Sequence, residues 1–383
     1  MTPIYLDHAA TSFPKAPGTT EAMVHYLTQV GASVNRGVYH SAQQAGLVCL
    51  SLRETLCELF HHDDPTCCLL TPGATWGINL VLRGLLKTGD HVLVSSMEHN
   101  AVMRPLRQLE AFGITFDRIP CDGDGYLDLS AMERLIRPNT RLVAISHSSN
   151  VSGAVQDAAA IGRICRAHGV YFLLDGAQTG GHWPIDMQAM GISALALPGH
   201  KGLLGPQGIG ALLLSRSLAE TLSPVVTGGT GSASHTEYQP DYLPDKFEPG
   251  TPNLPGIYGL EAAVRFVASR GIEAFRKEEQ ELSRRFLDGL KDIDRIHLAG
   301  PWDHRDRTAV FSLDFPGQDN AEIAWRLETE FGILTRCGLH CAPSAHKTLG
   351  TFPHGTVRFS FGFGTTEHHI DSALEAIRIL SSD

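Results

Sequence analysis

The sequence predicts an α/β fold in which a mainly parallel, seven-stranded sheet carries helices on both faces. Short apolar or β-branched runs alternate with amphipathic segments from about residue 67 to 214, which is typical of such sheets. Polar and glycine-rich segments follow several of these runs, at the strand ends where such sheets bind ligands. The expected strands are residues 68–70, 91–95, 114–119, 142–146, 171–174, 194–197 and 210–214, and the expected helices are residues 74–86, 100–110, 129–136 and 158–168.

A second, smaller α+β domain is expected over residues 256–383. The chain of 383 residues is long enough for two domains. A passage rich in glycine, serine and proline, residues 227–256, interrupts the alternation, and a long helical stretch, residues 260–290, comes after it. We therefore expect a large domain over residues 15–255, with the N-terminal segment 1–14 packed on the small domain.

Composition disfavours several classes of protein. The formal net charge of −10 and the lack of a basic run argue against nucleic-acid binding. No stretch approaches the roughly 18 apolar residues of a membrane span, and the first residues lack the charged and apolar regions of a secretory signal. Eight cysteines in a chain of this length do not suggest a disulfide framework. We expect a cytoplasmic protein without nucleic-acid or membrane partners.

Lys201 lies in Pro198-Gly199-His200-Lys201-Gly202, directly after a predicted buried strand. Burial disfavours the ammonium form and yields the neutral amine that attacks carbonyl groups. The same segment is compatible with a surface lysine in a turn, so by itself it leaves both interpretations open.

Other polar residues follow predicted strands. Asp175 ends one of them, where a carboxylate either keeps a pyridine nitrogen protonated or caps the next turn. Ala74 and Thr75 begin a helix, whose first N–H groups either bind phosphate or belong to an ordinary capped helix. His99 follows another strand and is either a stacking or proton-transfer group or a polar loop residue.

Separated motifs occur in one order along the chain: Tyr5-Leu6-Asp7-His8-Ala9-Ala10-Thr11, Glu98-His99, Ser149-Asn150, Asp175-x-x-Gln178, Gly199-His200-Lys201 with Gly205-Pro206-x-Gly208, and Phe247-Glu248-Pro249-Gly250-Thr251-Pro252-Asn253. Together they resemble the class V aminotransferase family of fold-type I pyridoxal-phosphate enzymes. Within that family the chain is similar to cysteine desulfurases of the NifS/SufS kind. The resemblance runs from residue 4 to about residue 375.

The resemblance implies that pyridoxal 5'-phosphate is the cofactor. Lys201 would hold it as a Schiff base, and Asp175 would pair with the pyridine nitrogen. His99 would stack on the ring and take part in catalysis, and Gln178 would hydrogen-bond the ring hydroxyl.

The resemblance also implies how the phosphate is held. Ala74, Thr75 and His200 would contact it from the same chain. Gly250 and Thr251 would reach it from a neighbouring subunit, which implies a homodimer with shared sites.

At one position the chain departs from the family. The family usually has serine or threonine where this chain has Pro198, and proline offers neither a hydroxyl nor an N–H group. One phosphate contact is therefore expected to be missing.

The segment Thr335-Arg336-Cys337-Gly338-Leu339-His340-Cys341-Ala342-Pro343 carries two cysteines and a histidine. These are possible zinc ligands, but no second cluster completes a four-ligand site, so no metal is expected. A calcium loop at residues 122–125 is disfavoured because the later bidentate glutamate is missing.

The resemblance assigns this segment to the desulfurase active-site loop, with Cys341 as the nucleophile and Cys337 as the less favoured thiol. A thiolate beside Arg336 and His340 would have a depressed pKa. Arg336 and Asn150 would bind the substrate. Arg358 matches the family's arginine that grips the substrate α-carboxylate, a task that suits a planar guanidinium.

The activity implied by the resemblance is the conversion of L-cysteine to L-alanine. Sulfur would pass to a persulfide on Cys341 and then to an acceptor protein or thiol. The alternatives left open are selenocysteine lyase, cysteine-sulfinate desulfinase, another class V activity such as transamination, and a binding module that kept the fold. A serine or cysteine hydrolase is disfavoured because no nucleophile-elbow pattern is present.

Overall fold

The computed structural model describes residues 3–34 and 37–382, and it confirms the predicted fold class. Its central sheet has seven strands in the order β2-β8-β7-β6-β5-β3-β4. Only β8 runs antiparallel to its neighbours; the remaining pairs are parallel. The strands are β2 (Cys68–Thr71), β3 (His91–Ser95), β4 (Thr115–Ile119), β5 (Thr140–Ser146), β6 (Tyr171–Asp175), β7 (Ala194–Pro198) and β8 (Gly210–Leu214).

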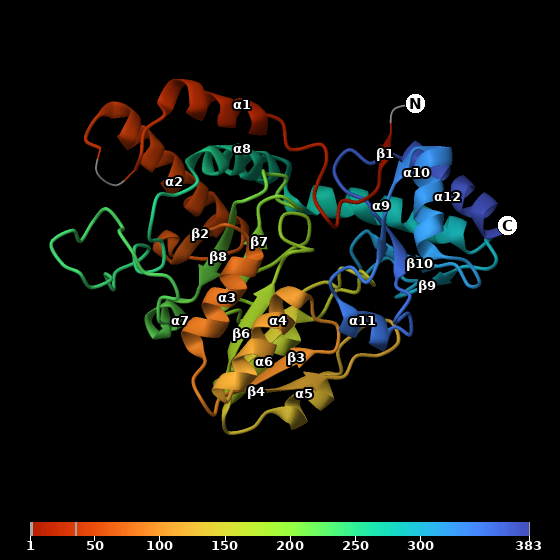
Figure 1. The fold of residues 1–383 in the computed structure, drawn as a ribbon, viewed down its shortest axis with the longest axis horizontal. Helices are drawn as coiled ribbons and strands as arrows, with labels where there is room; N and C mark the ends of the chain where they lie inside the picture. Colours follow the sequence, from red (N-terminus) through yellow and green to blue (C-terminus); the bar gives the residue numbers. More distant parts are fainter. Residues whose placement is uncertain (1–2, 35–36, 383) are drawn as a thin grey trace.

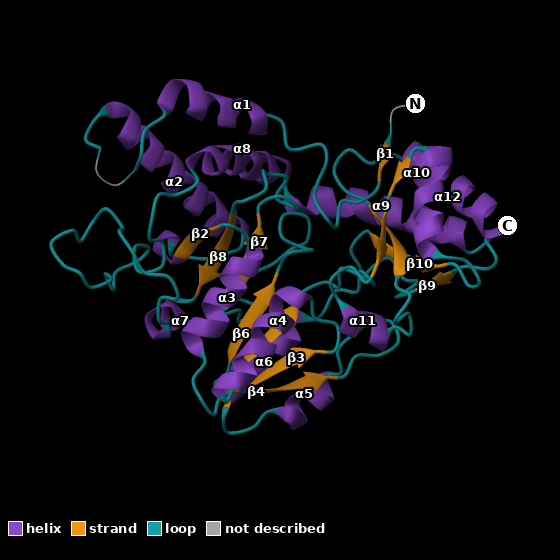
Figure 2. Cartoon of the chain, in the orientation of Figure 1, coloured by secondary structure: helices purple, strands orange, loops and turns teal. Residues whose placement is uncertain are grey.

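Helices cover both faces of this sheet (Figure 2). Successive residues of a strand point to opposite faces, so Phe172 and Leu174 join one buried cluster while Leu173 joins the other. The first cluster includes residues of α2 (His40–Leu59), α6 (Ala158–His168) and α8 (Leu254–Arg270), and the second includes residues of α3 (Ala74–Leu85), α4 (Asn100–Leu109) and α7 (Arg216–Thr221).

The helical stretch predicted for residues 260–290 is wrong as one helix, because it consists of α8 and α9 (Ile272–Leu290). Gly271 separates them with φ +84°, a left-handed conformation that glycine adopts without strain. α8 packs against α2 and α1 (Thr19–His25), whereas α9 packs against α12 (Glu367–Ser382).

The C-terminal part contains a four-stranded sheet in the order β12-β13-β10-β9. The N-terminal strand β1 pairs in parallel with β11, and Leu6 joins the buried cluster of the C-terminal part (Figure 1). The predicted domain boundary at residue 256 stays a prediction. The elements of this part are β1 (Ile4–Tyr5), β9 (His297–Leu298), β10 (Val310–Asp314), β11 (Ile333–Leu334), β12 (Arg336–Gly338), β13 (Thr356–Ser360), α10 (Asn320–Phe331) and α11 (Pro343–Thr348).

The remaining elements are short connections: a π-helical turn (Tyr26–Val30), two 3₁₀ turns (Pro65–Cys67 and Glu110–Phe112) and α5 (Leu129–Leu135). Among the described residues, we find no helix with both the length and the apolar character that crossing a bilayer requires.

Candidate active site

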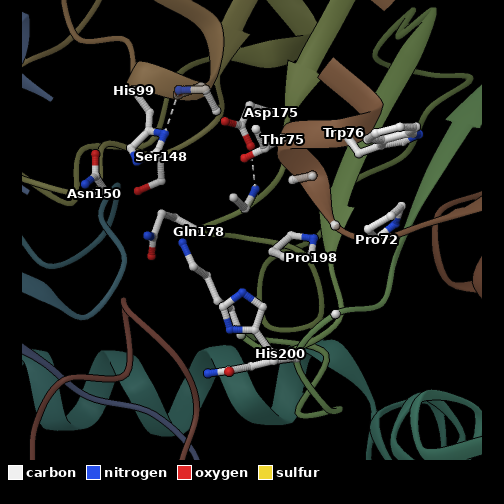
Figure 3. Close-up of a pocket in the computed structure, with 18 residues that line it drawn as sticks. Pro72, Thr75, Trp76, His99, Ser148, Asn150, Asp175, Gln178, Pro198 and His200 are labelled. Atoms are coloured by element: carbon white, nitrogen blue, oxygen red, sulfur yellow. Dashed lines mark hydrogen bonds between the residues drawn. The ribbon is translucent and has the colours of Figure 1, made fainter. Parts of the chain in front are cut away.

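A cavity of about 530 Å³ lies where strands β2, β3, β5, β6 and β7 end. This volume is in the range of small-molecule sites. Figure 3 shows His99, Ser148 and Asn150 on one side of the cavity and Thr75, Trp76 and Pro198 on the other. The structure thus brings together the residues predicted from separate motifs: Ala74, Thr75, His99, Asn150, Asp175, Gln178, His200 and Lys201.

Lys201 follows β7 and lines the cavity. Its backbone carbonyl accepts a bond from the N–H of Leu204 (2.9 Å), which closes a turn. Burial lowers the pKa of its amine to about 8, although the nearby Asp175 carboxylate acts in the opposite direction. A larger fraction of the Lys201 amine is therefore in the neutral, nucleophilic form than in an exposed lysine at the same pH.

Asp175 is the last residue of β6, and its side chain is buried. Its Oδ1 accepts a hydrogen bond from the backbone N–H of Ala177 (3.0 Å). Burial raises the pKa of this carboxyl, while that hydrogen bond and Lys201 lower it. A desolvated carboxylate of this kind suits a cationic N–H partner such as a pyridinium.

His99 caps α4: its Nδ1 accepts a hydrogen bond from the N–H of Ala101 (3.0 Å). The neutral ring therefore carries its proton on Nε2. Burial, Lys201 and Arg358 together lower the pKa of His99 to about 4. Near neutral pH the ring presents an uncharged face and one N–H donor, which suits stacking on a planar ligand.

The opposite end of the cavity offers backbone donors for an anion. Within the described residues, the N–H groups of Ala74 and Thr75 at the start of α3 have no hydrogen-bond partner, and such groups bind phosphate. Nδ1 of His200 lies 3.1 Å from Thr11 Oγ1, and burial lowers the pKa of His200 to about 4. Pro198 lines the cavity without a donor.

These features fit pyridoxal phosphate. The cavity combines a desolvated lysine amine, a buried carboxylate, a neutral imidazole and a helix N-terminus with free N–H groups. Those are the groups that this cofactor needs for attachment, ring protonation, stacking and phosphate binding.

Arg358 lies on β13 of the C-terminal part and is not among the residues that line the cavity. Its Nη2 donates to Asp7 Oδ1 (2.8 Å) and its Nη1 to the carbonyl of Asn150 (3.2 Å). Its Nε is buried without a partner among the described residues. Arg336 lies opposite Arg358 in the antiparallel pair β12–β13, so both side chains project from the same face.

Cys341 is exposed on the loop that follows β12. Its carbonyl accepts from the N–H of Asn100 (2.8 Å), and the carbonyl of His340 accepts from Nδ2 of Asn150 (2.6 Å). The thiol loop is therefore fixed to the start of α4, one residue from His99. Cys337 pairs with Val357, which belongs to the buried C-terminal cluster, so it projects from the face opposite Arg336 and Arg358.

The expectation that His340 lends positive charge to Cys341 is wrong. Burial is the main cause that lowers the pKa of His340 to about 2, and Arg358 adds to it. The ring is therefore neutral at physiological pH. No group of three or more metal-ligating side chains converges anywhere in the described ranges.

Gly250 and Thr251 do not reach the Lys201 cavity within their own chain. They line an adjoining groove, which shares Pro72, Trp76 and Gly208 with the cavity. Arg53 and Glu248 also line this groove, and their side chains form an ion pair at 2.7 Å.

Two acids near the site, the partly buried Asp7 and the buried Glu98, were not assigned a role from the sequence. Asp7 pairs with Arg358. Glu98 accepts hydrogen bonds from the hydroxyls of Ser95 (2.6 Å) and Ser146 (2.9 Å), and burial raises its pKa to about 7. Their position in the sequence could have pointed to them, because each acid directly precedes a histidine near the end of an apolar run.

Residues 4–373 match the class V aminotransferase family. The chain belongs to this family, whose members depend on pyridoxal phosphate.

Within the family, chains similar to this one include cysteine desulfurases. A probable cysteine desulfurase of Pyrococcus abyssi is 32% identical over 381 residues, covering 98% of this chain and 91% of the relative. The cysteine desulfurase IscS of Vibrio cholerae is 32% identical over 392 residues, covering 98% and 92%. The solved apo structure of the cysteine desulfurase from Thermococcus onnurineus NA1 superposes with a TM-score of 0.93 at 30% identity, covering 99% of this chain and 95% of that one.

Proposed function

We propose that this protein is a pyridoxal-phosphate-dependent cysteine desulfurase that converts L-cysteine to L-alanine and carries the released sulfur on Cys341. The observation that supports the proposal is an exposed thiol, Cys341, on a loop whose backbone is bonded to residues at the edge of the lysine cavity. The loop of Cys341 is bonded to Asn100 and Asn150, which flank the cavity residues His99 and Ser148.

Different cavity residues bind the cofactor and move the substrate proton. When bound, pyridoxal phosphate supplies an electrophilic carbon and an electron-accepting ring. Asp175 holds the proton on the ring nitrogen, and the N–H groups of Ala74 and Thr75 hold the phosphate. Lys201, with its lowered pKa, takes and returns the proton at the substrate Cα.

The substrate carboxylate is bound by the arginines of the paired strands β12 and β13. Arg358 presents the unpartnered Nε, and Arg336 is exposed on the same face. A guanidinium binds a carboxylate through two parallel N–H bonds, which fixes the orientation of the amino acid.

The sulfur step uses Cys341. Its thiolate attacks the sulfur of the bound cysteine, and an S–S bond forms as the Cβ–S bond breaks. The electron pair of the broken bond stays with the carbon skeleton, which is protonated and leaves as alanine. The persulfide on Cys341 then passes its outer sulfur to the thiol of an acceptor.

We propose a homodimer as the working form. Gly250 and Thr251 line the adjoining groove of about 580 Å³ and are not among the residues that line their own cavity, which leaves them available to the phosphate site of a second copy. Mixing the Lys201→Ala chain with a Thr251→Asp chain tests this, because a shared site predicts that mixed dimers regain activity that neither variant has alone.

The activity is tested by incubating the purified holoenzyme with L-cysteine, cysteine sulfinate or selenocysteine, with and without an acceptor thiol, and measuring alanine. We expect alanine from L-cysteine, rising with the thiol, and loss of this reaction in Cys341→Ser. Alanine from selenocysteine or cysteine sulfinate alone would assign one of the other lyase activities. No alanine from any of the three would reject the proposed reaction class.

A further inference from the structure

The side chain of His340 is buried, whereas Cys341 beside it in sequence is exposed. His340 is 8% exposed, and its Nε2 lies 3.1 Å from Thr356 Oγ1 on β13. Its ring lies against that of His346 on α11, with the centroids 5.5 Å apart and the planes at 40°. The ring of His346 is fully buried and bonds Thr351 Oγ1 through Nδ1 (2.7 Å). The two rings therefore anchor the loop between β12 and α11.

The backbone of this loop is in a conformation that side chains rarely adopt. His340 has φ +47° and Cys341 has φ +57°. Non-glycine residues in the left-handed region are uncommon, although histidine and asparagine are enriched there, and each costs of the order of 1–3 kcal/mol unless its surroundings enforce it. Two such residues in succession turn the chain sharply at the thiol.

Apart from the ring of His340, three hydrogen bonds hold this turn, and each is accepted by a backbone carbonyl of residues 339–341. The carbonyl of His340 accepts from Asn150 Nδ2, the carbonyl of Cys341 accepts from the N–H of Asn100, and the N–H of Ala342 donates to the carbonyl of Leu339 (2.8 Å). Without the buried ring, only backbone carbonyls would hold the turn.

Burying these two rings costs free energy, because each ring leaves one nitrogen without a hydrogen-bond partner. Nδ1 of His340 and Nε2 of His346 are both buried without partners in the described part of the chain, and an unsatisfied buried polar atom costs about 1–3 kcal/mol. An apolar residue would avoid this cost but is poorly suited to the left-handed turn. A histidine at residue 340 therefore costs stability through its unpartnered nitrogen, but it allows the backbone to make the left-handed turn.

We propose that His340, supported by His346, is a positioning residue that fixes the direction in which the Cys341 thiol is presented, and that it does so as an uncharged anchor. The inference deepens the proposed function, since it assigns what orients the sulfur-carrying thiol. The groups that act on the ring electrostatically are Arg336 on β12, Arg358 on β13 and His346 on α11.

The test is alkylation of Cys341 by iodoacetamide, followed peptide by peptide by mass spectrometry across a range of pH. This readout needs neither cofactor turnover nor substrate, so it stands even if the proposed reaction is wrong. His340→Asn keeps a residue that tolerates the left-handed turn but removes the ring. His354→Asn, at an exposed histidine of the same part of the chain, is the matched control.

We expect His340→Asn to leave the pH midpoint of alkylation unchanged while altering the limiting rate at alkaline pH. In the holoenzyme it should lower cysteine-dependent alanine formation by about ten- to a hundred-fold, the range expected for a misplaced reacting group, with an unchanged visible spectrum. His346→Gln should change the limiting alkylation rate and the rate of alanine formation in the same directions as His340→Asn does. His354→Asn should change neither rate.

Two results would overturn the inference. A rise in the pH midpoint of alkylation in His340→Asn would mean that His340 acts on the thiol through charge. Wild-type limiting rates in both His340→Asn and His346→Gln would mean that the rings do not position the thiol. If His340→Asn does not fold, as judged by circular dichroism, the comparison of His346→Gln with the control decides.

Discussion

The guanidinium of Arg358 donates to the carboxylate of Asp7 at 2.8 Å, joining the N-terminal segment to β13. The pair is largely buried, with side-chain exposures of 3% for Arg358 and 19% for Asp7. Because Arg358 also donates to the carbonyl of Asn150, only its Nε lacks a partner in the described residues. A substrate carboxylate bound at Arg358, as proposed, would therefore share the guanidinium with Asp7.

This relationship predicts opposite effects of Asp7→Asn on binding and on stability. Removing the competing carboxylate should lower the KM for L-cysteine several-fold. Losing the partner of a buried arginine should lower the free energy of unfolding by about 3 kcal/mol. Steady-state kinetics and urea unfolding measure the two effects, with Asp294→Asn at an exposed position as the control. A raised KM with unchanged stability would contradict this account of the pair.

Pro198→Ser should tighten cofactor binding. The serine would add a hydroxyl donor at the phosphate end of the cavity, and a hydrogen bond to a charged group contributes about 1.5–3 kcal/mol. We expect the Kd for pyridoxal phosphate to fall about ten-fold or more, measured by titrating the apoprotein and following absorbance.

Pro198→Ala distinguishes the effect of the serine hydroxyl from the effect of the backbone N–H group, because alanine restores the N–H group alone. If Pro198→Ala binds the cofactor as tightly as Pro198→Ser, the hydroxyl is not the missing contact.

His147 should make the protein less stable in mild acid. Its ring is 2% exposed and contacts Thr179 Oγ1 at 3.1 Å, and burial lowers its pKa from 6.5 to about 4. The folded state thus binds this proton less readily than the unfolded state. The resulting stability is complete above pH 6.5 and is lost as the pH falls toward 4, by about 3 kcal/mol.

The measurement is the free energy of unfolding in urea as a function of pH. His147→Gln should be less stable than the wild type at neutral pH but should lose less stability on acidification. His354→Asn should keep the wild-type slope because its side chain is exposed. An identical slope in His147→Gln and wild type would show that His147 does not titrate as described.

The strands, and the gathering of the lysine-cavity residues at one edge of the sheet, were predictable because both depend on short local sequence patterns. Every strand of the central sheet except the edge strand β4 contains a short apolar run, and the carboxyl ends of parallel strands meet at one edge. Asp175, His99 and Lys201 could therefore be placed together before their contacts were known. The break between α8 and α9 at Gly271 was harder to predict, since an isolated glycine in a helical pattern is often tolerated within the helix.

Contacts between distant segments could not be predicted in this way. Asp7 and Arg358 are 351 residues apart, and no spacing rule joins them. The error at His340 has a similar origin: its direction depends on a left-handed turn that the residue types permit but do not require. Proximity to Cys341 in sequence suggested a charged neighbour, whereas the fold buries the ring.

The central claim is that Cys341 carries the sulfur taken from cysteine. It is tested most directly by incubating the holoenzyme with L-cysteine in the absence of other thiols, trapping persulfides with an alkylating reagent and sequencing the peptides by mass spectrometry. We predict one additional sulfur atom on Cys341, none on Cys337, and none on either residue in Lys201→Ala. An additional sulfur on Cys337 instead, or alanine release without any protein-bound sulfur, would contradict the claim.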